Sequence, residues 1–250
     1  MAGKTNSAGA AVTLAVIAVL AGGYSVFMGL QTLILVESHW WQRTHPELSE
    51  VPRPLVSTDS AAGKGTEVEA FGFKFEAPWS DLDKIDPGAG FAIISFRSGL
   101  RIVFFDPSGA ADVAHGMKAE ADTQRLQRTY AVFGDSPFDN NYDFYQAVFS
   151  ASPAQISIVA PRQAALRMSV LLLWKISLVY DAETGFYSFQ SGKLRAFQRG
   201  DPERARYVIV DTFDMHDRQF GLVFTARPDS SARVTQGDIN RVVATLRPAY

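Results

Sequence analysis

The fold class is decided by the carboxyl-terminal part of the chain, where residues 186–226 read FYSFQSGKLRAFQRGDPERARYVIVDTFDMHDRQFGLVFTA. Apolar and polar residues alternate there with a period of two, which is typical of half-buried β-strands. Turn-forming residues divide this stretch into four expected strands, at 186–190, 193–199, 206–213 and 219–226. Strands joined by such short turns form an antiparallel meander.

Three more strands are expected upstream of the meander. The first lies at residues 71–78, where phenylalanine alternates with glycine, lysine and glutamate. The other two, at 91–96 and 100–105, are apolar runs separated by Ser98-Gly99, so they predict a tight hairpin.

Helices are expected next, at residues 117–133 and within an insertion over residues 135–180. In the insertion, Ser136 has the sequence context of an N-cap, and Ser152 opens a capping box. After Pro161 the chain is apolar on almost every face of a helix. This pattern predicts either a helix buried in the core or a helix packed on a membrane or a partner.

Thr235 and Asp238 predict the cap of a final helix, which Pro248 ends. The order of strands, helices, strands and helix predicts an α+β fold, in which helices cover an antiparallel sheet. This globular domain is expected to span residues 67–250, after one amino-terminal transmembrane helix.

The composition supports a packed core and excludes several classes of protein. Of the 250 residues, 47% are hydrophobic and none is cysteine. The lack of cysteine excludes thiol catalysis, cysteine-ligated zinc and iron-sulfur clusters. With 24 basic and 26 acidic residues, the net charge of -2 gives no reason to expect nucleic acid as a partner.

A transmembrane helix is predicted at residues 10–36, AAVTLAVIAVLAGGYSVFMGLQTLILV, after a short tail at residues 1–9. The segment contains no charged residue, and about 20 apolar residues suffice to cross the hydrocarbon layer. Trp40, Trp41 and Arg43 follow it, where an interfacial belt of aromatic and basic residues is expected. The chain is therefore expected to contact the lipid bilayer through residues 10–36.

A cleaved secretory signal ending near Ala21 is the alternative, but the apolar sequence continues well beyond that point, to Val36. Lys4 lies in the short tail before the apolar segment, as in an uncleaved signal-anchor. This arrangement favours a single-pass protein with its amino end inside and its globular domain outside the cytoplasm, in the periplasm.

Residues 37–66 are expected to form a juxtamembrane flank and a linker. From Pro46 to Thr66 the chain is rich in proline, serine, alanine and glycine and shows no apolar periodicity. That composition predicts a tether, extended at residues 52–54.

The two ends of the globular part resemble the PsbP-like fold family. The resemblance lies in the opening strand FGFKFEAPW at residues 71–79, the terminal meander and the closing helix DINRVVATLRP at residues 238–248. It implies a helix-covered antiparallel sheet and a role as an accessory or assembly subunit. It implies no shared set of catalytic residues.

The sequence contains no motif of a nucleophile, P-loop or dinucleotide site, so no catalytic residue or cofactor is predicted. The densest polar cluster is Asp211, Asp214, His216 and Asp217, whose residue types suit a hard cation or zinc. Residues 135–143 also resemble a calcium loop, although they lack its glycine and glutamate. The alternatives are an exposed turn and a helix N-terminus, so no metal site is predicted.

Two surfaces are candidates for partner binding. On the helix after Pro161, the residue types enriched at interfaces are Arg167, Leu171 and Trp174. On the meander, the period of two places Lys193, Arg195 and Arg199 on one side together with Phe197. This basic group suits an acidic partner or lipid headgroups, and its alternative is an ordinary solvated face.

These observations favour a non-enzymatic, single-pass membrane protein that acts as an accessory, assembly or scaffold subunit of a larger membrane protein complex. The alternatives are a membrane-tethered hydrolase or metal-dependent enzyme, and a carrier that holds a small apolar ligand between sheet and helices. Copurification with a large complex would support the first hypothesis. Metal content or hydrolysis would support the enzyme, and a bound apolar molecule would support the carrier.

Overall fold

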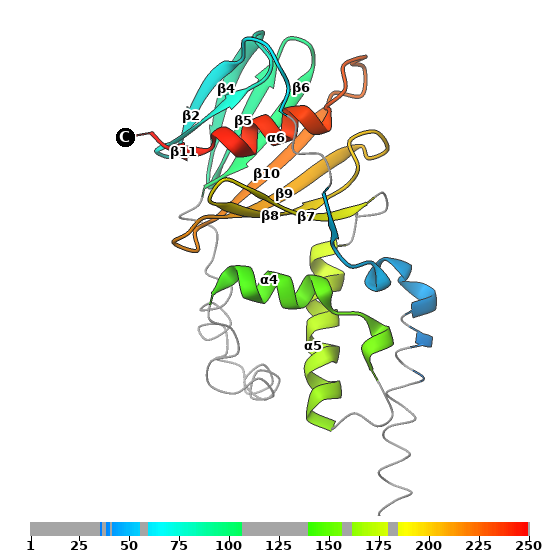
Figure 1. Ribbon diagram of the computed structural model, residues 1–250. Coiled ribbons are helices and arrows are strands. Elements are labelled where there is room, and N and C mark those ends of the chain that lie inside the picture. Colours follow the sequence, from blue (N-terminus) through cyan, green and yellow to red (C-terminus); the bar gives the residue numbers. More distant parts are fainter. Residues whose placement is uncertain are drawn as a thin grey trace, which may run out of the picture.

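Figure 1 shows the computed structural model of the chain, which describes residues 36, 39–40, 42–55, 60–106, 140–156, 162–179 and 185–249. The expected transmembrane helix lies outside these residues except for Val36, and the helix expected at 117–133 lies wholly outside them. Within the described residues, no helix is both long and apolar enough to cross a bilayer.

The fold is α+β, and its centre is a mostly antiparallel sheet of eight strands. These strands are β1 (Arg53–Pro54), β4 (Leu82–Gly88), β5 (Phe91–Phe96), β6 (Leu100–Phe105), β7 (Phe186–Ser191), β8 (Leu194–Arg199), β9 (Tyr207–Phe213) and β10 (Gln219–Ala226). Their order in the sheet is β1-β7-β8-β9-β10-β6-β5-β4. Only the short β1 is parallel to its neighbour, β7. The expected meander and the β5–β6 hairpin are confirmed.

A second sheet has three strands, in the order β11-β3-β2. They are β2 (Thr66–Ala70), β3 (Phe73–Ala77) and β11 (Arg247–Pro248). The strand expected at residues 71–78 starts two residues later, because Phe71 and Gly72 form the turn between β2 and β3, with φ angles of 53° and 73°. The sequence analysis also missed β2 and β4, both of which contain many charged residues.

Helix α6 (Gln236–Thr245) and the small sheet lie on one face of the large sheet (Figure 1). The Thr235 side chain accepts a hydrogen bond from Asp238 N–H, and the Asp238 carboxylate accepts one from Thr235 N–H, so the expected cap is confirmed. Ile239, Val242 and Val243 of α6 are completely buried against the sheet. They belong to the first of two hydrophobic cores.

The second core lies on the other side of the meander, between the sheet and helices α4 (Asn141–Ser150) and α5 (Arg162–Val179) (Figure 1). Most of its aromatic pairs pack edge to face, such as Phe149 and Phe186, whose ring centroids are 4.8 Å apart. The capping box at Ser152 is confirmed, but it starts only the short 3-10 helix η3 (Pro153–Gln155). The N-cap of α4 is Asn140, and Ser136 lies outside the described residues.

The segment expected to be a tether is instead partly docked on the domain. Residues 46–49 form the 3-10 helix η1 (Pro46–Ser49), in which Leu48 is completely buried in the second core. Residues 53–54 are extended, as expected, but they pair with β7 as strand β1. The backbone N–H of Leu55 then donates to the Ser188 carbonyl at 3.0 Å. Burial of Leu48 and pairing of the exposed strand β1 with β7 therefore hold a segment whose composition alone predicts flexibility.

Candidate functional site

Lys175 of α5 is completely buried, and its ammonium group binds three backbone carbonyl groups from two segments of the chain. Nζ donates hydrogen bonds to the carbonyl oxygens of Leu48 at 3.1 Å, Glu50 at 2.5 Å and Ala151 at 2.6 Å. Burial lowers the pKa of Lys175 to about 8, an effect that the charge of Glu50 opposes. These acceptors compensate the cost of removing an amine from water. Lys175 therefore holds residues 48–50 and the end of α4 against α5.

A second polar network joins both helices to the sheet. Arg199 of β8 forms a buried ion pair with Asp211 of β9 at 2.5 Å and also donates to the Leu178 carbonyl of α5. Gln219 Nε2 donates to the Tyr145 hydroxyl of α4 at 2.8 Å and to Asp211 at 3.3 Å. Burial and the nearby Asp211 carboxylate raise the pKa of Tyr145 to about 12. The network is internal: its contacts are with one another and with the Leu178 carbonyl, and the buried Nε of Arg199 has no hydrogen-bond partner among the described residues.

The carboxylates of the cluster at residues 211–217 are separated and individually engaged. Asp211 pairs with Arg199, while Asp214 accepts from the backbone N–H groups of His216 and Arg218 at 2.8 and 2.9 Å. Asp217 accepts from the first backbone N–H groups of α4. In the part of the chain that the structure describes, no group of three histidine, cysteine, aspartate or glutamate side chains is placed to hold a metal ion.

The segment that resembles a calcium loop forms the start of α4 where it is described. The Asn140 side chain accepts from Asp143 N–H at 2.9 Å and donates to the Asp143 carboxylate at 2.8 Å. Asp135 and Asp139 lie outside the described residues. The described polar groups thus serve as a helix cap.

The three basic residues of the meander have different environments. Arg195 and Arg199 share a face with Phe197, toward α4, where the guanidinium carbon of Arg195 lies 3.7 Å from the ring centroid of Tyr142. Arg199 is held by Asp211, whereas Lys193 is exposed in the β7–β8 turn. The structure does not join these residues into one basic surface.

Helix α5 has a buried side and an exposed side. Leu171 is buried in the second core, and Trp174 is half-buried, with its ring 5.6 Å from that of Phe144 in an edge-to-face contact. Arg167 is exposed, and so is 53% of Leu173. One side of the helix is therefore buried in the core and the other is exposed at the surface. Leu171 lies on the buried side.

The residues expected at the membrane interface are described in part. Trp40 and Arg43 are exposed, and Trp41 lies outside the described residues. The exposure of a tryptophan side chain just after the apolar segment is compatible with an interfacial position.

A cleft of about 310 Å³ lies between two hairpin turns and the end of α6. Its lining comes from the β7–β8 turn, the β9–β10 turn, Ala244, residues 246–248, Phe73 and Phe220, and we call it the hairpin cleft. Lys193, Arg218 and Arg247 contribute positive charge to it. The sequence analysis did not identify this cleft, because its lining comes from distant segments; the one local signal is Met215, a large apolar residue in a polar turn.

Comparisons with protein-family models, with curated proteins and with solved structures found no match. The geometry of the described residues is therefore the basis for a functional proposal.

Proposed function

We propose that the chain is a non-enzymatic, single-pass membrane protein that holds its α+β domain beside the bilayer as an accessory, assembly or scaffold subunit of a larger membrane protein complex. The apolar segment at residues 10–36 supplies the anchor, and the domain lies outside the cytoplasm. The observation that carries the proposal is the contact of Lys175 with the carbonyl oxygens of Leu48 and Glu50.

This contact supports a scaffold because it joins the domain directly to the chain that follows the anchor. A free linker would let the domain adopt many orientations. Here Leu48 of η1 is buried in the second core and β1 is paired with β7, so the juxtamembrane segment moves with the domain. In Figure 1, α5 extends away from the large sheet on the side where the described amino-terminal residues lie. A partner in the same membrane would meet this helical layer first.

The use of polar residues also favours a scaffold over an enzyme. Arg199, Asp211 and Gln219 bind one another, and Asp217 caps α4. These groups stabilise the packing of helices on the sheet, which is the property that a docking platform requires.

The exposed side of α5 is the proposed docking surface, with the exposed Arg167 and Leu173 at its two borders and the half-buried Trp174 between them around the helix. Arginine and tryptophan are enriched among the residues that dominate interface energies. An exposed leucine beside them adds apolar area that a partner can cover.

The test is extraction of the full chain from its native membrane in a mild detergent, followed by separation by size. We expect it to migrate with a stoichiometric partner. Leu173→Asp should release the partner while the melting temperature stays unchanged, because this side chain is largely exposed. Lys64→Glu, at an exposed residue elsewhere, is the control and should retain the partner. Migration of the wild type as an isolated chain would contradict the proposal, and loss of the partner only on unfolding would contradict the docking surface.

A further inference from the structure

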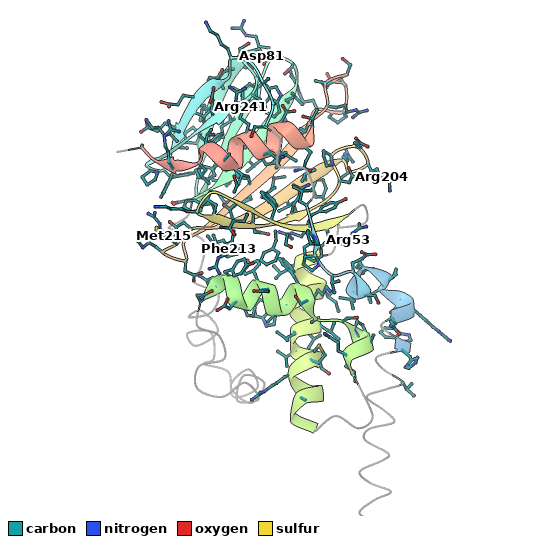
Figure 2. The ribbon with its side chains drawn as sticks, in the orientation of Figure 1. Arg53, Asp81, Arg204, Phe213, Met215 and Arg241 are labelled. Carbon is teal, nitrogen blue, oxygen red and sulfur yellow. The ribbon has the colours of Figure 1, made fainter. Side chains whose placement is uncertain are left out.

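The hairpin cleft combines an apolar floor with a positively charged rim. Phe73, Phe220 and Leu246 form the apolar part of its lining, which we call the floor. Phe220 and Leu246 belong to the first hydrophobic core, and Phe73 packs against it. Met215 lies in the β9–β10 turn at the edge of the domain, and 66% of it is exposed (Figure 2). A ligand that covered Met215 would remove apolar surface from water, which favours binding.

The rim contains three cations, of which two are already paired. Arg218 is held by Asp214 at 2.7 Å, and its guanidinium carbon lies 5.1 Å from the ring centroid of Phe73. Arg247 pairs with Glu67 at 3.2 Å. Among the described residues, Lys193 has no ion-pair partner. The cleft therefore presents one uncompensated positive charge beside an apolar floor.

We propose that the hairpin cleft binds a small amphipathic carboxylate. Its carboxylate would lie beside Lys193, and its apolar tail would lie against the half-buried Phe73 and the exposed Met215. A volume of about 310 Å³ is near the lower limit for small-molecule sites, roughly 300 to 1,000 Å³, so the ligand is small. The single free cation selects a monoanion. This inference rests on the cleft alone and does not depend on the proposed role at the membrane.

The experiment uses the full chain with ¹³C-methyl-labelled methionine, placed in phosphatidylcholine nanodiscs. The probe is 4-phenylbutyrate, a monoanion with an apolar tail, and the matched neutral probe is 4-phenylbutan-1-ol. We expect 4-phenylbutyrate to shift the Met215 methyl signal in a saturable way. The alcohol should bind about threefold more weakly, because one attraction between exposed charges is lost.

Two charge reversals locate the carboxylate. Lys193→Glu should weaken binding of 4-phenylbutyrate by about tenfold, because attraction becomes repulsion. Lys64→Glu makes the same change at the far end of the β2–β3 hairpin and should leave the affinity unchanged. Both residues are exposed, so both variants should keep the wild-type melting temperature.

Several results would overturn the proposal. One is the absence of a saturable Met215 shift, and another is equal affinity for the acid and the alcohol, which would mean that the cleft has no preference for an anion. Equal weakening by the two charge reversals would mean that only net charge matters. A Met215 shift produced by adding phosphatidylglycerol to the nanodiscs, and competing with 4-phenylbutyrate, would assign the cleft to lipid headgroups instead.

Discussion

Asp217 accepts a hydrogen bond from the backbone N–H of Asn141 at 2.5 Å, so a residue of the β9–β10 turn caps a helix whose first residue lies 76 positions earlier. Its second carboxylate oxygen accepts from Tyr142 N–H at 3.1 Å. Asp217 has a φ angle of 60°, a conformation that aspartate and asparagine adopt more readily than most other residues. The turn thus fixes where α4 begins on the sheet.

Replacing Asp217 should destabilise the domain through this cap. Asp217→Ala removes both acceptors and should lower the free energy of unfolding by about 1 to 2 kcal/mol, as measured by urea denaturation. Asp217→Asn keeps one acceptor and tolerates the positive φ angle, so it should lose less than half of that amount. Equal stability of Asp217→Ala and the wild type would show that water replaces the cap.

Local patterns were sufficient to predict most of the meander. The period of two from Phe186 to Ala226 predicted four strands whose limits differ from the observed ones by one residue at most. The period succeeds because successive side chains of a strand face opposite sides of the sheet: Ala196 of β8 is buried in the first core, and the next residue, Phe197, is buried in the second. It failed for β4, an edge strand with three charged residues, because an edge strand buries too little to impose a pattern.

Lys175→Met should weaken the docking of residues 46–55 on the domain. The change preserves the apolar stem but leaves the carbonyl oxygens of Leu48, Glu50 and Ala151 without their donor. We expect a loss of about 2 kcal/mol in the free energy of unfolding. Amide hydrogen exchange should accelerate at residues 46–55 and stay unchanged in β9 and β10. Uniform acceleration of amide exchange across the chain would mean that Lys175 stabilises the whole fold and not only the docking of residues 46–55.

The lowered pKa of Lys175 also predicts a dependence of stability on pH. Its pKa is about 8 in the folded protein and returns to 10.5 when the chain unfolds. Between pH 8 and pH 10.5 the unfolded chain therefore binds more protons, so the free energy of unfolding contributed by this group rises with pH. The rise amounts to at most about 3 kcal/mol and should be present in the wild type but absent in Lys175→Met. If the free energies of unfolding of the two proteins changed with pH in parallel, Lys175 would not be the source of the rise.

The candidate sites were harder to predict than the strands, because their geometry depends on contacts between distant segments. Lys175 was visible only as a lysine in an apolar helix, and nothing in the sequence indicated that residues 48–50 would supply its acceptors. Asp211 and Asp217 are six residues apart and suggested a common site, yet they serve different partners on β8 and α4. Periodicity indicates which side of an element a residue faces, but it does not indicate what lies opposite.

Removing one partner of the Arg199–Asp211 pair should be more damaging than removing both. Asp211→Leu leaves a buried guanidinium without its carboxylate, and such a change costs about 3 to 5 kcal/mol. The double variant Arg199→Met, Asp211→Leu removes both charges and keeps a similar apolar volume. It should recover more than half of that loss, because an uncompensated buried charge is the main penalty. Urea denaturation of the two single variants and the double variant measures the coupling between the residues.

The matched control for this cycle is Arg218→Met with Asp214→Leu, because that ion pair also lies in the meander but has a more exposed arginine. Its coupling energy should be about 1 kcal/mol or less, since solvent screens the charges. Similar coupling energies for the two pairs would mean that burial does not strengthen the interaction between Arg199 and Asp211. An Asp211→Leu variant as stable as the wild type would mean that water reaches Arg199 and replaces the carboxylate. In that case the ion pair would not contribute to holding α5 on the sheet.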